Sequence, residues 1–219
     1  MFSMHFILRI NSICAKIHKY VIFEPSKYAI TEMKKNNFKI ITHDYSNRVL
    51  EEVEYEKVSF LSCDFTNSNL IGVEFEDCVF EQCNLSNARI EGTAFKNCQF
   101  IECKMLGMSF SQSKDFGFDI HCLSCNMSFV SFDKKKLNKS TFKQCNVEGV
   151  NFTQSNISGS KFDGCNFLDA QFSNTNLSGV DFRTNVHFII HPEANTITKT
   201  RFASQDLFRL LAAYNIQID

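Results

Sequence analysis

An apolar residue recurs at every fifth position of this chain from Phe60 to Phe182, with a single interruption. The first block of this register runs from Phe60 to Phe110, and the second, displaced by two residues, runs from Cys122 to Phe182. Neither an α-helix, with about 3.6 residues per turn, nor a flat strand, whose side chains alternate between two faces, repeats every five residues. A short fixed period indicates that one structural unit is stacked on itself many times. The chain is therefore expected to fold as a solenoid.

Each five-residue unit directs one large and one small side chain inward. Small residues such as Cys63, Val73 and Ser155 stand two places before the apolar centre. Glycine or asparagine often stands two places after the centre, and both tolerate the positive φ of a tight turn at little steric cost. Fourteen of the 24 phenylalanines occupy centres and form the predicted core: Phe60, Phe65, Phe75, Phe80, Phe95, Phe100, Phe110, Phe132, Phe142, Phe152, Phe162, Phe167, Phe172 and Phe182.

Several units resemble the repeat of the pentapeptide-repeat family. Residues 63–67 (CDFTN), 155–159 (SNISG) and 175–179 (TNLSG) match its order of a small residue, a polar residue, Leu or Phe, a polar residue, and Gly or another polar residue. The resemblance implies an all-β fold, a right-handed quadrilateral β-helix with four units in each coil. Residues twenty apart then stack in one column, as Phe60, Phe80 and Phe100 would.

The two-residue slip is expected to lie at a corner of one coil. If it does, the same column continues through Cys122, Phe142, Phe162 and Phe182, which makes six coils. We expect the slip itself to form a looped corner, with Asp115, Phe116 and Phe118 outside the regular pattern.

The repeat divides the chain into three parts. Residues 53–185 form the predicted β-helix, 186–219 a C-terminal cap and dimerisation segment, and 1–52 an N-terminal extension that is poorly ordered or partly helical. No stretch is long and apolar enough to span a membrane, and the first residues lack the features of a secretory signal. We therefore expect a cytoplasmic protein that does not contact the membrane.

An apolar stripe near the C-terminus indicates a short helix. Leu207, Leu210, Leu211 and Tyr214 have the spacing of one helix face, and Ser204 stands where it could cap the helix. A solenoid exposes its stacking surface at each end and needs caps. The stripe could serve only as a plug on the last coil, or could also form a two-fold dimer contact; we favour a homodimer through this segment.

The tail also resembles one subfamily more narrowly. Residues 190–197 (IHPEANTI), 201–203 (RFA) and 216–218 (IQI) are similar to the ending of the subfamily that includes the albicidin-resistance and microcin-immunity proteins, and 103–107 (CKMLG) is similar to the albicidin-resistance type. The resemblance, which extends to the related Qnr proteins, implies binding to a type II topoisomerase, DNA gyrase or topoisomerase IV. It implies protection from quinolone-like or peptide poisons by a rod that mimics duplex DNA. The loops that project from Qnr proteins are absent from this sequence, as in the albicidin-resistance type.

Charged residues at outward positions are the candidate partner-binding groups. A DNA mimic would use carboxylates to meet a basic groove. Lysines at 134–136, 139 and 143 form a basic patch that a pure mimic does not need, and we interpret this patch as a solvated corner. Because the repeat alone does not determine the target, a rigid interaction scaffold with a different partner is the alternative. The candidate carboxylates are Glu74, Glu76, Asp77, Glu81, Glu91 and Glu102.

The sequence lacks the constellations that carry catalysis. Eight of the ten cysteines stand at the small inward position and Cys122 at a central one, so we expect buried, reduced, metal-free thiols. There is no phosphate-binding loop, no metal-ligand spacing, and no Ser, Cys or Thr that is recognisably paired with a base. We expect no enzyme, no cofactor, no metal site and no direct contact with nucleic acid.

Overall fold

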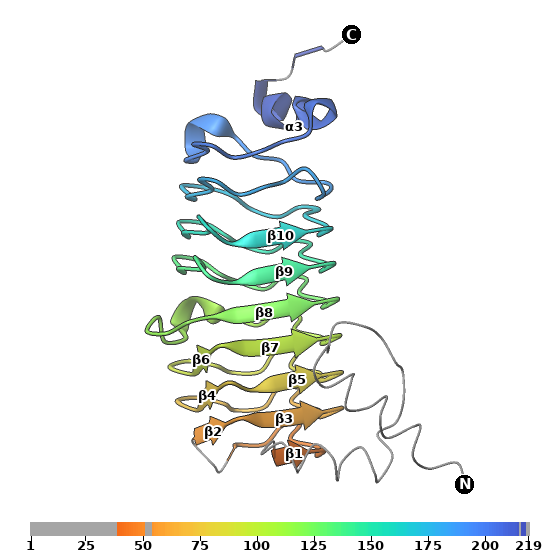
Figure 1. Cartoon of the computed structure of the whole chain (residues 1–219), viewed down its shortest axis with the longest axis vertical. Helices are drawn as coiled ribbons and strands as arrows, with labels where there is room; N and C mark the ends of the chain where they lie inside the picture. Colours follow the sequence, from red (N-terminus) through yellow and green to blue (C-terminus); the bar gives the residue numbers. More distant parts are fainter. Residues whose placement is uncertain (1–38, 51–53, 215, 218–219) are drawn as a thin grey trace, which may run out of the picture. The chain divides into compact units, whose positions relative to one another are not determined.

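Residues twenty positions apart lie directly above one another in this protein. The computed structural model describes residues 39–50, 54–214 and 216–217, and in it Phe60 pairs with Phe80 and Phe80 with Phe100 on parallel strands. Across the slip Phe100 pairs with Cys122, which pairs in turn with Phe142. Figure 1 shows the resulting stack of coils. The predicted all-β solenoid with a short C-terminal helix is confirmed.

Each coil has four faces, of which two contain strands. The first face is one parallel sheet in the order β1-β3-β5-β7-β8-β9-β10, and the fourth face carries a smaller sheet in the order β2-β4-β6. The first-face strands are β1 (Lys39–Ile41), β3 (Val58–Leu61), β5 (Val79–Glu81), β7 (Cys98–Ile101), β8 (Ile120–Leu123), β9 (Thr141–Lys143) and β10 (Lys161–Asp163). The fourth-face strands are β2 (Glu54–Glu56), β4 (Glu74–Glu76) and β6 (Ala94–Lys96).

The second and third faces are joined by isolated bridges. Asp64 pairs with Asn84 on the second face, and Asn69 pairs with Arg89 on the third. The bridges extend the stack beyond the predicted bounds of 53 and 185, because they also join Asp44 to Asp64 and residue 181 to residue 201. Most of the expected N-terminal extension lies outside the described residues.

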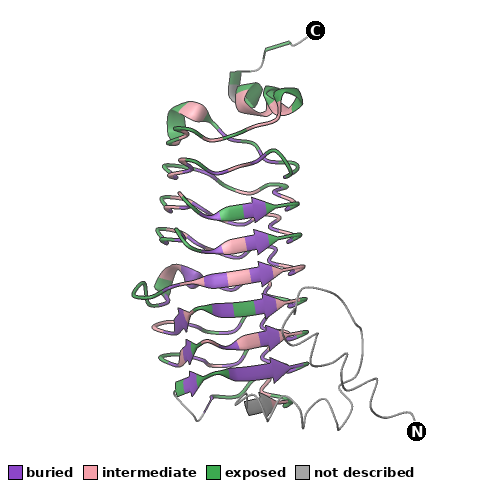
Figure 2. Ribbon diagram, viewed as in Figure 1, coloured by how far each residue is buried: buried purple, intermediate pink, exposed green. Residues whose placement is uncertain are grey.

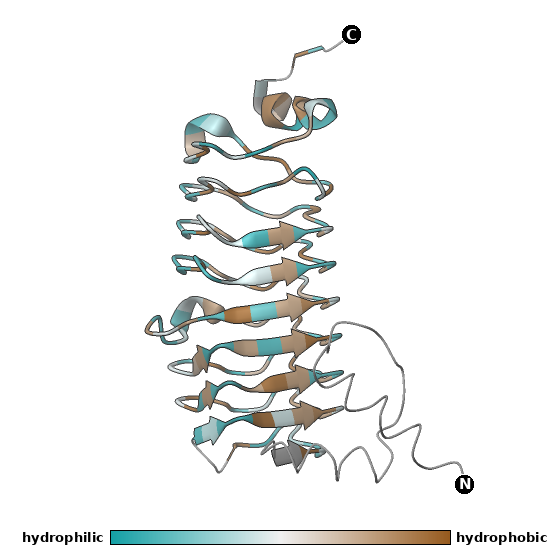
Figure 3. Ribbon diagram, viewed as in Figure 1, coloured by the Kyte–Doolittle hydropathy of each residue, from teal (hydrophilic) through white to brown (hydrophobic). Residues whose placement is uncertain are grey.

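The interior is a column of rings at the spacing of adjacent strands. The centroids of Phe60 and Phe80 lie 4.8 Å apart and those of Phe142 and Phe162 lie 4.7 Å apart, with the rings nearly parallel. This spacing equals the separation of neighbouring strands, about 4.8 Å, so rotamers repeat from coil to coil. All fourteen phenylalanines named above are buried (Figure 2). Hydrophilic residues gather at many of the turns (Figure 3).

The turns between faces depend on the left-handed backbone conformation. The residue two places after most centres adopts a positive φ both where it is glycine, as at Gly92 (68°), and where it is not, as at Asn87 (57°). Glycine and asparagine adopt this conformation more cheaply than other residues do. The five-residue spacing of the turns therefore sets the size of the coil.

The expected looped corner lies at residues 113–119, directly after η1 (Phe110–Gln112). Phe116 points outward and is 86% exposed. Phe118 was expected outside the regular pattern, but its side chain returns to the core and packs edge-on against Phe110, with ring centroids 5.8 Å apart. The loop therefore places the ring of Phe116 in solvent and the ring of Phe118 in the core.

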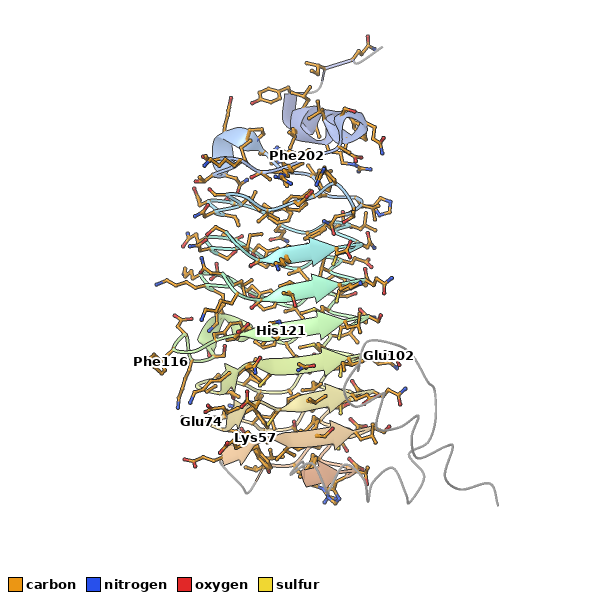
Figure 4. The ribbon with its side chains drawn as sticks, viewed as in Figure 1. Lys57, Glu74, Glu102, Phe116, His121 and Phe202 are labelled. Atoms are coloured by element: carbon orange, nitrogen blue, oxygen red, sulfur yellow. The ribbon has the colours of Figure 1, made fainter. Side chains whose placement is uncertain are left out.

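The C-terminal cap is shorter than the apolar stripe indicates. The chain passes through η2 (Pro192–Ala194), η3 (Ser204–Asp206), α3 (Phe208–Leu211) and η4 (Ala212–Tyr214). The expectation that Ser204 caps the helix is wrong, because Ser204 is the first residue of η3 and no side chain caps either element. Phe202 stacks on Phe182 with ring centroids 5.6 Å apart, which closes the column below α3 (Figure 4). None of the described helices has the length and apolarity needed to span a bilayer.

We predict that Phe80→Asp or Phe142→Asp prevents folding, whereas Gln82→Asn, at an exposed turn of the same coil as Phe80, leaves stability nearly unchanged. Removing a buried Phe side chain alone costs about 3–5 kcal/mol, and a buried unpaired charge adds to that cost. Surface changes usually stay within about 0.5 kcal/mol. Circular dichroism would show whether each of the three variants folds, and thermal unfolding would measure its stability. Equal stability of the three variants would contradict the register described here.

Candidate functional site

Four glutamates lie in register on the fourth face. Glu54 pairs with Glu74 and Glu56 with Glu76 across β2 and β4. Their strand centres are buried, so the flanking side chains point outward. Adjacent coils are about 4.8 Å apart, which places like charges close together. We call Glu54, Glu56, Glu74 and Glu76 the acidic strip.

Half of the acidic strip was missing from the sequence-based candidates. Glu54 and Glu56 flank Tyr55, which is buried and stacks on Phe75 with ring centroids 5.4 Å apart. Tyr55 stands five residues before Phe60 and so continues the five-residue register toward the N-terminus. Extending the register by one unit would have identified both glutamates.

Lysines partly neutralise the acidic strip. The Nζ of Lys96 lies 3.3 Å from Glu74 Oε2 and 3.5 Å from Glu76 Oε2, and the Nζ of Lys114 also pairs with Glu74. Hydrogen bonds from Lys114 and Lys96 hold the pKa of the Glu74 carboxyl below its usual value. Lys57 pairs with Glu56 at 2.6 Å, but both side chains are exposed, so this pair contributes little. The strip therefore keeps a negative excess that is smaller than its sequence suggests.

The structure does not gather the six candidate carboxylates into one patch. Glu74 and Glu76 belong to the acidic strip, and Asp77 occupies the next turn, where its Oδ1 accepts a hydrogen bond of 2.6 Å from Asn97. Glu102 lies at the opposite edge of the coils from Glu74 (Figure 4). The remaining two candidates are Glu81, at the end of β5, and Glu91, on the third face.

Glu81 is electrostatically distinct because it is half-buried beside another carboxylate. Burial, and secondarily the charge of Glu102, raises the pKa of the Glu81 carboxyl above its usual value. Glu102 itself accepts a hydrogen bond of 3.1 Å from Gln82. This edge of the first face therefore holds two carboxylates, one of which is stabilised in its protonated form.

Six cysteines form a column inside the second face: Cys63, Cys83, Cys103, Cys125, Cys145 and Cys165. Each thiol donates to a backbone carbonyl oxygen of the preceding coil, as Cys103 Sγ does to Phe80 O at 3.3 Å. Burial raises the pKa of the neighbouring thiol of Cys78 to about 11. The cysteines of the described segments are buried and unpaired, and those segments contain no group of His, Cys, Asp and Glu that could hold a metal. We therefore assign these thiols a structural role, as small buried side chains of the core.

One pairing of a hydroxyl with a base does occur, contrary to the expectation from sequence. His121 Nδ1 lies 2.9 Å from Thr141 Oγ1, and its Nε2 lies 3.5 Å from Asp119 Oδ1. Thr141 stands on β9, which pairs with strands on both sides, so the neighbouring backbone N–H groups cannot serve an oxyanion. His121 lies in the middle of the first face (Figure 4). The arrangement is one surface hydrogen bond beside a carboxylate, without the features of a nucleophilic site.

The C-terminal stripe divides between core and surface. Leu210 packs against the interior, whereas Leu207 and Leu211 are exposed. Tyr214 is also exposed, and its hydroxyl donates to Glu193 Oε1 at 2.9 Å. Phe208, half exposed, was not among the sequence-based candidates. We call the exposed residues Leu207, Phe208, Leu211, Tyr214 and Ile216 the C-terminal patch.

Family models identify the class of protein that this fold defines. A model of pentapeptide repeats in eight copies matches residues 63–100, and a model of a pentapeptide repeat region matches residues 118–186. The chain belongs to the pentapeptide-repeat family. No curated protein matches its sequence.

Comparison with solved structures matches several proteins, of which HetL and Rfr23 are described as pentapeptide-repeat proteins. A trypsin-treated form of QnrB1, a plasmid-mediated fluoroquinolone resistance protein, is 15% identical with a TM-score of 0.45, over 83% of this chain and 99% of that one. HetL of Nostoc sp. strain PCC 7120, involved in heterocyst differentiation regulation, is 10% identical with a TM-score of 0.22, over 75% of this chain and 82% of that one. Rfr23 of Cyanothece 51142 is 9% identical with a TM-score of 0.21, over 80% and 93% of the two chains. At these identities and scores, the similarities do not assign a partner.

We predict that Glu81→Gln raises the free energy of unfolding at pH 7 but not at pH 4. A carboxyl whose pKa is raised on folding contributes stability below its unfolded pKa of about 4.3, and this contribution is lost as the pH rises through the folded value. The Gln side chain does not ionise, so the variant does not lose stability as the pH rises. Denaturant titrations of both proteins between pH 4 and 7 would measure the difference, with Asp169→Asn as a control for removing one exposed acid outside the acidic strip. Parallel pH profiles for wild type and Glu81→Gln would contradict the prediction.

Proposed function

We propose that the protein binds a type II topoisomerase, DNA gyrase or topoisomerase IV, and protects it from quinolone-like or peptide poisons. The observation that carries this proposal is the acidic strip, in which carboxylates of adjacent coils are aligned on a rigid rod. The resemblance of the tail, residues 190–197 and 201–203, to the topoisomerase-protecting subfamily supports the choice of target.

The acidic strip imitates only a short stretch of duplex. DNA carries one negative charge per about 1.7 Å of its axis, whereas the strip offers two carboxylates per step of about 4.8 Å, over two described coils. Lys96 and Lys114 neutralise part of this charge. The strip is therefore suited to orient the rod on a basic groove, with shape and packing supplying most of the affinity.

The lysines favour a second candidate function, a rigid scaffold for a different partner. Lys136 and Lys139 lie on the same side of the coil stack as the acidic strip, several coils further along. A partner that covers both regions needs groups of both signs. A topoisomerase surface that presented only basic groups would not meet this need.

We predict that the triple variant Glu54→Gln, Glu56→Gln, Glu76→Gln weakens protection of gyrase about tenfold in the concentration required, a loss of about 1.4 kcal/mol. Glu74 is retained because its lysine partners would otherwise be left unpaired. The measurement is the yield of poisoned cleavage complexes at increasing protein concentration. It is repeated at several salt concentrations, since screening should reduce the difference between variant and wild type.

The matched control is Glu148→Gln, Asp163→Asn, Asp169→Asn, which removes the same charge from other faces of the rod. Unaltered protection by this control is expected. If wild-type protein leaves poisoned complexes unchanged at every concentration, the topoisomerase proposal fails and the scaffold function takes its place.

We also propose that the protein forms a homodimer through the C-terminal patch. A two-fold contact is self-complementary, and the patch offers exposed Leu, Phe and Ile side chains at the end of the solenoid.

We predict that Leu207→Asp with Leu211→Asp produces monomers, because both side chains are exposed and their loss leaves the core intact. Sedimentation equilibrium would measure the mass. A wild-type protein that sediments as a monomer would refute the dimer, and Leu210, which packs on the core, is left unchanged.

A further inference from the structure

The two-residue slip creates a hollow on the fourth face. The hollow has a volume of about 350 Å³ and lies beneath the loop 113–119. Lys96 and Asn97 line it from the coil before the loop, and Lys136 and Lys139 line it from the coil after the loop. This volume falls within the range of small-molecule sites, about 300–1,000 Å³.

A buried lysine holds the hollow open. Lys135 stands at a small inward position, where a charged side chain should reach solvent or distort the coil. It is 1% exposed, and its Nζ donates to Ser113 O at 2.7 Å and to Lys114 O at 3.1 Å. The same Nζ lies 2.8 Å from Asp115 Oδ1 and 4.5 Å from the centre of the Phe118 ring. Two backbone carbonyls, a carboxylate and a ring are thus fixed by one ammonium group, so the loop is preformed.

The charges around the hollow do not cancel. Lys96 pairs with the acidic strip, and Asp115 pairs with Lys135. Lys136 and Lys139 form no ion pair with any other residue in the described part of the chain. After these pairings the hollow is lined by two ammonium groups and one carboxylate, that of Asp119, so an excess of positive charge remains for an external anion.

Hydrogen-bond acceptors remain on the other walls. Asp119 Oδ1 is a buried atom with no hydrogen-bond partner, and His121 Nε2 lies 3.5 Å from it. Asn97 and Asn138 use their amide nitrogens on Asp77 and Ser158, which leaves their carbonyl oxygens as acceptors. Because Oδ1 itself is buried, a ligand donor would reach Asp119 through the exposed part of its side chain, which is 22% accessible.

We propose that this hollow binds a small phosphomonoester that carries hydroxyl groups. The phosphate would lie against Lys136 and Lys139, and a hydroxyl would donate to Asp119. Neither inorganic phosphate nor an uncharged sugar satisfies both sides of the hollow. The proposal is independent of the topoisomerase, because it uses no residue of the acidic strip.

Isothermal titration calorimetry on the full chain tests the site with three probes: ribose 5-phosphate, ribose and inorganic phosphate. We expect saturable binding of ribose 5-phosphate, at least tenfold weaker binding of inorganic phosphate, and no binding of ribose. Lys136→Gln with Lys139→Gln should abolish binding. Asp119→Ala removes the acceptor for the hydroxyl, and it also removes a negative charge, which acts on both phosphates alike. We therefore expect this variant to reduce the preference for ribose 5-phosphate over inorganic phosphate several-fold.

The control variant is Lys161→Gln with Lys199→Gln, which removes two exposed lysines from elsewhere on the solenoid and should bind as wild type does. Thermal unfolding of each variant establishes that it is folded before titration. Failure of ribose 5-phosphate to bind the wild type overturns the proposal. Equal affinity for ribose 5-phosphate and inorganic phosphate also overturns it, because the lysines would then be a simple anion patch.

Discussion

The structure depends on the stacking of equivalent side chains at the spacing of parallel strands. The rings of Phe60, Phe80 and Phe100 repeat at 4.8 Å, which is both a favourable stacking distance and the separation of backbone strands. One repeat distance therefore satisfies the core and the backbone hydrogen bonds together. The thiols at the small inward positions follow the same rule, since each donates to a carbonyl of the preceding coil. Any unit with a large centre and a small residue before it can be added to such a stack.

This regularity explains why the interior was predictable and the surface was not. A five-residue period fixes which side chains point inward, so the column through Cys122 and Phe142 follows from counting alone. Counting does not determine which outward charges meet. Lys114 reaches Glu74 across forty residues, and this pair depends on how far the loop projects. The acidic strip and its lysine partners could therefore be identified only from the structure.

Where the chain departs from the repeat, the five-residue pattern also could not predict how the side chains are arranged. Lys135 stands at a small inward position, where a charged residue should either escape to solvent or distort the coil. The structure shows a third solution, in which the carbonyls of Ser113 and Lys114 turn toward the ammonium group. Burial lowers the pKa of Lys135, against the opposing effect of Asp115, so the lysine costs stability that a serine would not. Ser204 does not cap the helix, because it is already the first residue of the short 3-10 helix η3.

The slip places the irregular features of the rod within one region of the fourth face. The acidic strip ends at Lys96, the loop carries Phe116 into solvent, and unpaired lysines follow on the next coil. A perfectly regular solenoid presents nearly the same surface at every level and has few ways to distinguish partners. Next to a single insertion, which one buried ammonium group holds in place, the surface charge of this rod changes from negative to positive and a hollow forms. Specific recognition by a repetitive fold is therefore expected to reside where the repeat is broken.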